Sequence, residues 1–183
     1  DIAIRYADCV CREIGPGEGQ QVLVPGHQIA EMALAKLYIV TGDQKYLDEA
    51  KFFLDQRGHT SRRDAYSQAH KPVVEQDEAV GHAVRATYMY AGMADVAALK
   101  KDTAYVEALN RLWDDVVLRN MYVTGGIGSS RHNEGFTEDY DLPNLDAYCE
   151  TCASVGMVYW NQRMNQFTGD SKYIDVLERS MYN

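Results

Sequence analysis

A short turn pattern recurs along the chain and constrains its fold more than any other feature. Residues 41–48 read TGDQKYLD, residues 168–175 read TGDSKYID, and a worn copy, KDTAYVE, occupies residues 101–107. Each copy follows one stretch of apolar residues at helical spacing and opens another. Glycine commonly follows the end of a helix, and aspartate is a favoured N-cap. Each copy is therefore predicted to be the elbow of a helical hairpin.

The elbows divide the chain into a series of predicted helices. Residues 1–8 share Asp, Ala, aromatic and Asp positions with residues 48–55, so the chain is predicted to open inside the second helix of an earlier hairpin. Apolar periodicity places the later helices at residues 28–40, 44–56, 75–99, 103–119 and 145–167, and a last one from residue 170 to the end of the chain.

The spacing of the elbows predicts the architecture. Elbows about 60 to 70 residues apart are typical of repeats that stack on their neighbours. Six such hairpins, roughly 350 residues, would close an (α/α)6 barrel. The expected fold class is all-α, with helical hairpin repeats forming about half of an (α/α)6 barrel. Residues 1–183 are expected to be one partial domain that begins and ends mid-repeat, so its partners would include the remaining segments of the same full-length protein.

Charge and hydropathy narrow the possible partners. The net charge is −9, which disfavours nucleic acid because phosphate binding requires clustered Lys and Arg. No run of about 18 apolar residues occurs, so no membrane contact is expected. No leader-like segment precedes Asp1, which favours the cytoplasm, although the N-terminus of the full protein is not present.

The four cysteines are too few for a domain of this length to depend on disulfide bonds. Two of them, Cys149 and Cys152, lie beside carboxylates and a glycine-rich turn. Glu150 and Cys152 can donate an oxygen and a thiolate to Zn²⁺. The alternative is an acidic first helical turn in which Cys149 and Cys152 are small buried residues, and a thiol redox pair is a third interpretation. Residues two apart lie on different faces of a regular helix, so shared ligation requires the backbone near Glu150 to be non-helical.

Glu134 is the candidate for acid–base chemistry. It lies in a polar, glycine-bearing loop over residues 121–144, and loops of that length in a compact domain are usually functional. The alternative is a solvent-exposed loop carboxylate. The glycine-rich residues 125–130 lack the Lys of a phosphate-binding loop and are interpreted as a tight turn that brings backbone near a ligand. Further loop carboxylates are Glu138, Asp139, Asp141 and Asp146.

Two histidines follow glycines: His27, after Gly26, at the start of one expected helix, and His82, after Gly81, inside another. In a toroid of hairpins, the N-termini of one set of helices line a rim of the central cavity. There, histidines can hydrogen-bond sugar hydroxyls, or each can be a satisfied structural residue. Trp113, Tyr159 and Trp160 have the same ambiguity, because aromatic residues at helical spacing either stack on a sugar or belong to the core.

These motifs together resemble glycoside hydrolase family 127, whose reference members are β-L-arabinofuranosidases. The resemblance covers nearly the whole chain and is most specific between residues 125 and 154. It is carried by residues 81–86 (GHAVRA), 90–95 (YAGMAD), 125–129 (GGIGS), 134–137 (EGFT), 139–144 (DYDLPN) and 148–154 (YCETCAS).

The resemblance implies an (α/α)6 barrel followed by β-sandwich domains, and a retaining hydrolase with a zinc-bound cysteine nucleophile. It implies that Glu134 is the general acid/base, that Glu150 and Cys152 are zinc ligands, and that His27 and His82 bind the sugar. The family has alanine where this chain has Cys149, so Cys149 is not expected to be a zinc ligand. The nucleophilic cysteine of the family lies downstream of Asn183.

The predicted function follows from this resemblance. The chain is expected to be part of a zinc-dependent retaining glycosidase that releases β-L-arabinofuranose or a related sugar from plant glycans. Its substrate would be a small oligosaccharide or glycoside. The isolated chain is expected to be inactive, because it lacks the nucleophile. The alternative is a non-catalytic helical-repeat module that binds carbohydrate or protein.

Overall fold

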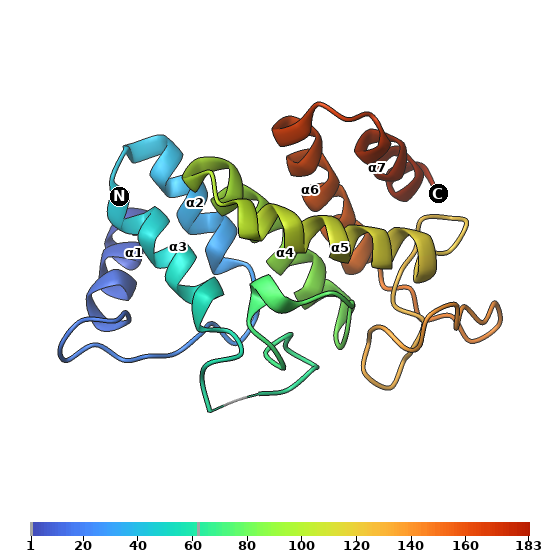
Figure 1. The fold of residues 1–183 in the computed structure, drawn as a ribbon, viewed down its shortest axis with the longest axis horizontal. Coiled ribbons are helices and arrows are strands. Elements are labelled where there is room, and N and C mark those ends of the chain that lie inside the picture. The colour runs from blue at the N-terminus through green and yellow to red at the C-terminus, as the bar shows by residue number, and fades with distance from the viewer. Residues whose placement is uncertain (1, 62) are drawn as a thin grey trace.

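The computed structural model describes residues 2–61 and 63–183 as a series of helical hairpins joined by loops (Figure 1). In this described part of the chain, extended segments pair only as isolated bridges. The all-α prediction is thereby confirmed. The helices are α1 (Ile2–Glu13), α2 (Ala30–Thr41), α3 (Gln44–Gln56), the short 3-10 helix η1 (Val73–Glu75), α4 (Ala83–Lys100), α5 (Thr103–Arg119), α6 (Thr151–Thr168) and α7 (Lys172–Tyr182).

The three elbows form as predicted. Gly42 and Gly169 follow α2 and α6 with φ angles of 74° and 75°, in the left-handed region that glycine enters without strain. Lys101 takes the same conformation after α4 with a φ angle of 56°. The side chains of Asp43 and Asp102 then accept backbone N–H groups of α3 and α5. Local capping interactions therefore end one helix and begin the next at each elbow.

A tyrosine in the elbow links a hairpin to the second, outer helix of the hairpin before it. The Tyr46 hydroxyl donates to Asp8 of α1 at 2.7 Å, and the Tyr105 hydroxyl donates to Asp55 of α3 at 2.6 Å. Asp8 and Asp55 hold equivalent places in the repeated sequence. The contact of α1 with the elbow at residues 41–48 therefore corresponds to the contact of α3 with the elbow at residues 101–107. This supports the prediction that α1 is the second helix of a hairpin; Asp1 itself lies outside the described residues.

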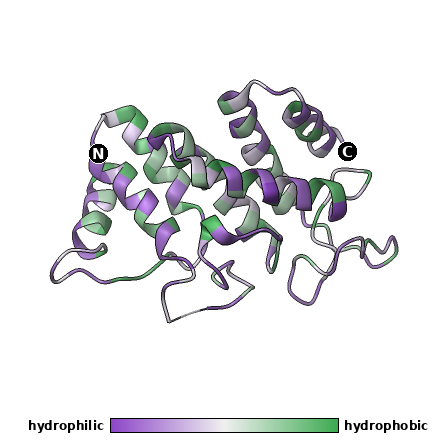
Figure 2. Ribbon diagram, in the orientation of Figure 1, coloured by the Kyte–Doolittle hydropathy of each residue, from purple (hydrophilic) through white to green (hydrophobic). Residues whose placement is uncertain are grey.

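The inner helices α2, α4 and α6 pack side by side and form most of the core. Small residues let them approach: a Cβ on Gly156 of α6 would lie 2.0 Å from Thr87 Oγ1 of α4. Tyr90 and Trp160 are both fully buried between these helices, with ring centroids 4.8 Å apart. Figure 2 shows the corresponding pattern, with hydrophobic and hydrophilic residues alternating around most helices.

Two predicted helix starts were wrong, because in each case a residue with left-handed backbone precedes the helix. The helix expected over residues 75–99 begins only at Ala83, because Gly81 turns at a φ angle of 70° with its backbone packed on Ala65. The helix expected over residues 145–167 begins at Thr151, because Cys149 has a φ angle of 41°. The helices over 44–56 and 103–119 match the prediction.

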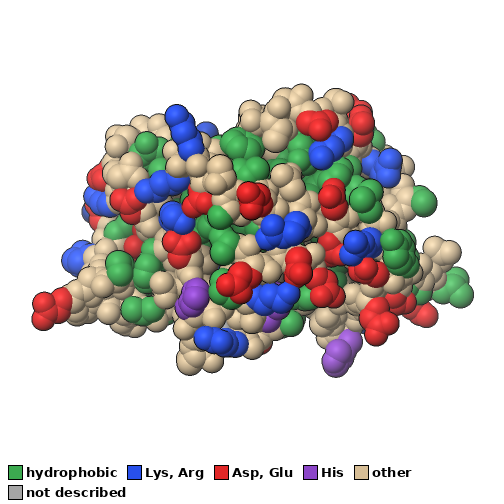
Figure 3. Space-filling view, in the orientation of Figure 1, with side chains coloured by type: hydrophobic (Ala, Val, Ile, Leu, Met, Phe, Trp, Pro, Cys, Tyr) green, Lys and Arg blue, Asp and Glu red, His purple; other side chains and the backbone are tan. Residues whose placement is uncertain are grey.

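The surface carries charges of both signs. On the face shown in Figure 3, Lys and Arg side chains are interspersed with Asp and Glu and do not gather in one patch. Among the described residues, no helix combines the length and the apolar character that a membrane span requires.

Candidate active site

The inner helices begin on the same side of the molecule, where the long loops gather along the lower edge of Figure 1. These loops are residues 14–29 before α2, residues 57–82 before α4 and residues 120–150 before α6. The three helix N-termini bring together all five residues that the sequence singled out: His27, His82, Glu134, Glu150 and Cys152.

The loop that carries Glu134 is bound to the start of α4 through backbone hydrogen bonds. Ala83 N–H donates to the Glu134 carbonyl at 3.1 Å, and Phe136 N–H donates to the Gly81 carbonyl at 2.9 Å. This close pairing requires Gly135, because a Cβ there would lie 1.7 Å from the Gly81 oxygen. The placement of Glu134 therefore depends on residues more than fifty positions earlier in the chain.

The Glu134 side chain lies between two hydrogen-bond donors. Its Oε2 is 3.1 Å from His82 Nε2, and its Oε1 accepts from the Tyr148 hydroxyl at 3.3 Å. The carboxylate remains 45% exposed, so it can reach a ligand. Glu134 has a φ angle of 51°, a conformation that non-glycine residues rarely adopt and that is concentrated at functional sites. A carboxylate aimed and held in this way suits proton transfer.

The proton positions on His82 follow from its partners. His82 is the N-cap of α4, and its Nδ1 accepts the backbone N–H of Arg85 at 3.2 Å. In a neutral imidazole the other nitrogen must then carry the proton, so Nε2 donates to Glu134. The ring is also packed edge-on against Tyr66, with centroids 5.3 Å apart. His82 is thus a fixed donor at the base of the site.

His27 has the opposite tautomer. Its Nδ1 is 3.0 Å from the Gln28 carbonyl oxygen, which can only accept, so Nδ1 carries the proton and Nε2 presents a lone pair. Partial burial lowers the pKa of His27, and the hydrogen bond to the Gln28 carbonyl opposes this effect without overcoming it. The lowered pKa favours the neutral ring. The His27 and His82 rings lie 6.1 Å apart, and Tyr88 packs edge-on against His27.

Glu150 and Cys152 stand at the start of α6. Glu150 is the N-cap, with extended backbone (φ −60°, ψ 133°), so the pair is not confined to opposite faces of a helix. Hydrogen bonding to Glu150 and the negative charge of that carboxylate raise the pKa of the Cys152 thiol. Donor atoms of Glu150, His82 and Glu134 all lie within 4.8 Å of one another, a spacing that a metal ion can bridge.

Several other candidates lie elsewhere. Asp139 pairs with Arg119 at 3.2 Å, and Glu138, Asp141 and Asp146 belong to the same outer loop. Trp113 and Trp160 belong to the core, whereas Tyr159 is 40% exposed beside Tyr88.

The glycine turn approaches another helix of the chain. A Cβ on Gly125 would lie 2.8 Å from the Ser180 backbone nitrogen of α7. This turn was predicted to bring backbone near a ligand; at Gly125 the close approach is instead to the backbone of α7. Cys149 is half-buried against Gly126, and burial raises the pKa of its thiol.

Sequence reasoning missed three tyrosines at the site: Tyr66, Tyr88 and Tyr148. Tyr148 directly precedes the Cys149–Glu150 motif, so its position in that motif was an available signal. Tyr66 lies in a loop without any recognisable pattern, and it reaches His82 only because residues 57–82 fold back over the start of α4.

Comparisons with known proteins agree on one family. The family model "Beta-L-arabinofuranosidase, GH127 catalytic domain" matches residues 1–183. The chain is 39% identical over 204 residues to the non-reducing end β-L-arabinofuranosidase of Bifidobacterium longum subsp. longum, and it covers 31% of that protein.

Solved structures share both fold and sequence with the chain. A GH127 β-arabinofuranosidase superposes with a TM-score of 0.98 at 67% identity, over 100% of this chain and 29% of its own. A GH127 β-L-arabinofuranosidase from Geobacillus stearothermophilus T6 has a TM-score of 0.94 at 46% identity, over 98% of this chain and 31% of its own. The chain thus spans less than a third of the length of these relatives. It belongs to glycoside hydrolase family 127 and forms part of the helical catalytic domain of that family.

Proposed function

We propose that the full-length protein releases β-L-arabinofuranose, or a closely related sugar, from the non-reducing ends of plant glycans. The observation that carries this proposal is the convergence of Glu134, His82, Tyr148 and Glu150 at the N-termini of the inner helices. Such a site joins an aimed carboxylate to fixed hydrogen-bonding groups. The activity named for the 39% identical relative supports the choice of sugar.

The architecture of the whole domain is part of the same proposal. The hairpins of this chain form about half of an (α/α)6 barrel, and segments outside the chain complete it. The exposed apolar residues Ile29, Val40 and Val155, at or beside the inner helices, are consistent with further packing. The sugar then lies at the rim where α2, α4 and α6 begin.

Glu134 is proposed to be the general acid/base. It protonates the glycosidic oxygen as the bond to the anomeric carbon breaks, and it then removes a proton from the water that releases the sugar. Net retention requires a nucleophile on the opposite side of the sugar ring. The proposed nucleophile is a cysteine beyond Asn183, in a part of the protein that this chain does not include.

The two histidines are proposed to bind the sugar through complementary groups. His27 presents an Nε2 lone pair, which accepts a hydrogen bond from a sugar hydroxyl. His82 presents its Nε2–H, which donates to Glu134 and is proposed to be shared with a sugar hydroxyl in the complex. The edge-on stack of His27 against Tyr88 holds the accepting ring in place.

We assign Glu150 and Cys152, at the start of α6, to two positions of a zinc site. Glu150 lies against Cys152 and raises the pKa of its thiol, and a bound cation would offset that repulsion and favour the thiolate. An oxygen and a sulfur donor suit Zn²⁺, and a tetrahedral site needs two further ligands, which we assign to the downstream cysteines. When bound, zinc supplies the positive charge that keeps a cysteine nucleophile deprotonated.

Substrate selectivity tests the proposed activity. The full-length protein is expected to hydrolyse p-nitrophenyl β-L-arabinofuranoside and to leave the α-L-arabinofuranoside intact, because nucleophile and acid flank only one anomeric configuration. Release of p-nitrophenol measures both, and the 183-residue chain alone is expected to release none. A full-length protein inactive on the β-glycoside contradicts the proposal; turnover by the chain alone contradicts the downstream nucleophile.

Metal content tests the zinc ligands. Full-length protein is expected to hold about one zinc per chain, and Cys152→Ser is expected to lose it, because a neutral hydroxyl replaces the thiolate ligand. Elemental analysis after dialysis measures the ratio. Cys149→Ser is the matched control and should retain zinc, since Cys149 packs against Gly126. Full zinc content in Cys152→Ser would remove Cys152 from the ligand set.

A further inference from the structure

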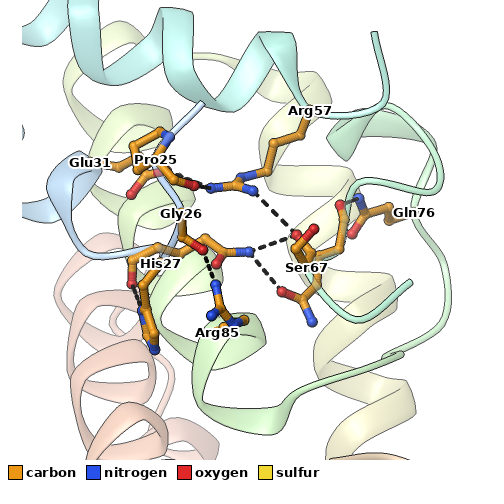
Figure 4. A network of polar contacts seen from close by, with 10 residues as sticks. Pro25, Gly26, His27, Glu31, Arg57, Ser67, Gln76 and Arg85 are labelled. Atoms are coloured by element: carbon orange, nitrogen blue, oxygen red, sulfur yellow. Dashed lines mark hydrogen bonds and ion pairs between the residues drawn. The ribbon is translucent and has the colours of Figure 1, made fainter. Parts of the chain in front are cut away.

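A buried polar network underlies the loops that carry the two histidines. Its members come from the start of α2 and from the 57–82 loop, and the side chains of Gln28, Arg57, Gln68 and Gln76 are all 0% exposed. Figure 4 shows Arg57 between Pro25 and Ser67, with Gln76 on the far side of Ser67. Buried amide and guanidinium groups are stable only when hydrogen-bonded, so their partners define what the network holds in place.

Gln68 connects this network to His82. Its amide nitrogen is 2.8 Å from the Val80 carbonyl oxygen and 3.2 Å from the His82 carbonyl oxygen. Its amide oxygen accepts from Gln28 Nε2 at 2.7 Å. Gln68 also has a φ angle of 55°, so the surrounding contacts must stabilise an unfavourable backbone conformation. The amide thus joins α2 to the residue that starts α4.

The other end of the network holds His27. Gln28 directly follows His27, and its amide also donates to the Ser67 carbonyl at 2.8 Å. Arg57 donates to the Pro25 and Ser67 carbonyls at 3.3 and 3.2 Å (Figure 4). The backbone on both sides of His27 is therefore fastened to the 57–82 loop.

We propose that Gln28 and Gln68 are positioning residues that set the spacing of His27 and His82 for sugar binding. The hydrogen bond between the two amides is a side-chain link between the loop of one histidine and the backbone of the other, beside the bond from Arg85 to the Gly26 carbonyl. This inference rests on the proposed function, because it assigns both histidines to the sugar.

The network is expected to act on binding more than on proton transfer. Glu134 Oε2 faces His82 Nε2, but Glu134 is also fixed by the hydrogen bond from Ala83 N–H to its carbonyl and by the Tyr148 hydroxyl, so a shifted His82 leaves these two contacts in place. Displaced histidines weaken contacts made alike to the substrate and to the transition state. Loss of such uniform binding raises KM and leaves kcat nearly unchanged.

The test replaces Gln68 with methionine, which keeps the side-chain length and removes the amide, in the full-length protein. With p-nitrophenyl β-L-arabinofuranoside, Gln68→Met is expected to raise KM roughly tenfold, and kcat should fall by less than about threefold. The inhibition constant of L-arabinose should rise by the same factor as KM. Gln28→Met is expected to raise KM as well, and the double variant should raise KM by less than the product of the two single effects, because the bond between the two amides is already lost in each single variant.

Asn161 provides the matched control. It is another fully buried amide, bonded to Trp113 and to the Met157 carbonyl between α5 and α6. Asn161→Leu is expected to lower the melting temperature without changing KM. A Gln68→Met protein with a lower melting temperature and wild-type KM would show that Gln68 only stabilises the fold, and this result would overturn the inference. If Gln68→Met does not fold, the same criterion applies to Gln28→Met.

Failure of the proposed function gives a different result. Wild-type full-length protein without activity on the β-glycoside contradicts that function and leaves the geometry open to a direct measurement. A crystal structure of the Gln28→Met protein should then show the His27 and His82 rings displaced from their 6.1 Å separation. Unchanged rings would overturn the positioning role by itself.

Discussion

Replacing Glu134 with glutamine in the full-length enzyme is expected to lower kcat on an alkyl β-L-arabinofuranoside by about 10²–10⁴-fold. The amide keeps the size of the side chain, but it can neither donate a proton to the glycosidic oxygen nor take one from water. The amide can keep both neighbours of Glu134, because its oxygen accepts from His82 Nε2 and its NH2 group donates to the Tyr148 hydroxyl oxygen. The substitution therefore changes chemistry more than position.

The leaving group separates an acid role from a structural one. p-Nitrophenol departs without full protonation, so the bond-breaking step of the aryl glycoside should be much less impaired in Glu134→Gln than that of the alkyl glycoside. An initial burst of p-nitrophenol measures that step alone. Glu138→Gln is the control, because Glu138 is an exposed carboxylate on the same loop, away from the site. Equal losses on both substrates would contradict general acid catalysis by Glu134.

Gly135→Ala is expected to be the most damaging small substitution in the chain. The added Cβ would lie 1.7 Å from the Gly81 oxygen and 2.9 Å from His82 Cα, both backbone atoms that cannot move aside independently. Relief requires separating the two loops, which breaks the hydrogen bonds from Ala83 and Phe136. We expect a loss of roughly 1–3 kcal/mol or more in unfolding free energy, together with loss of activity because Glu134 moves away from His82.

A second glycine distinguishes this close contact from a general effect of alanine. Gly169 has a φ angle of 75°, and a Cβ added there would meet no atom within 4 Å, so Gly169→Ala introduces backbone strain only. That strain costs about 1 kcal/mol. Denaturant unfolding and kcat/KM should be measured on both full-length variants. Gly169→Ala should lose stability and keep activity. A Gly135→Ala protein with wild-type kcat/KM would show that the Gly81–Gly135 contact does not position Glu134.

The predicted elements differ in accuracy for a physical reason. The helices over residues 44–56 and 103–119 were predicted to the residue, because an aspartate cap and apolar periodicity are local signals. The helix after Glu150 was predicted to start at residue 145, several residues too early. Leu145 and Ala147 continue an apolar pattern, but Cys149 takes a left-handed conformation that its own side chain disfavours, imposed by bonds from residues 148 and 149 to residues 129 and 128.

The candidate site shows the same division. The residue types in the motifs pointed to Glu134, Glu150 and Cys152, and the resemblance to the family assigned their expected roles. Neither indicated that Tyr66 packs on His82 or that Gln68 bonds to its carbonyl. Those contacts join positions in loops of irregular backbone, whose course depends on many weak long-range interactions.

The hairpins, their elbows and the family can all be read from the sequence, because capping, periodicity and motif identity are encoded in neighbouring residues. The link between successive hairpins was also implicit, since Asp8 and Asp55 recur with the repeat. Only the folded structure revealed the direction in which Glu134 points, the tautomer of each histidine and the extended backbone of Glu150 before α6. The direction of Glu134 and the non-helical backbone at Glu150 depend on hydrogen bonds between segments remote in sequence, and such pairings form only after the helices have packed. The histidine tautomers follow from hydrogen bonds to the neighbouring residues Gln28 and Arg85, whose geometry is set where the helices begin.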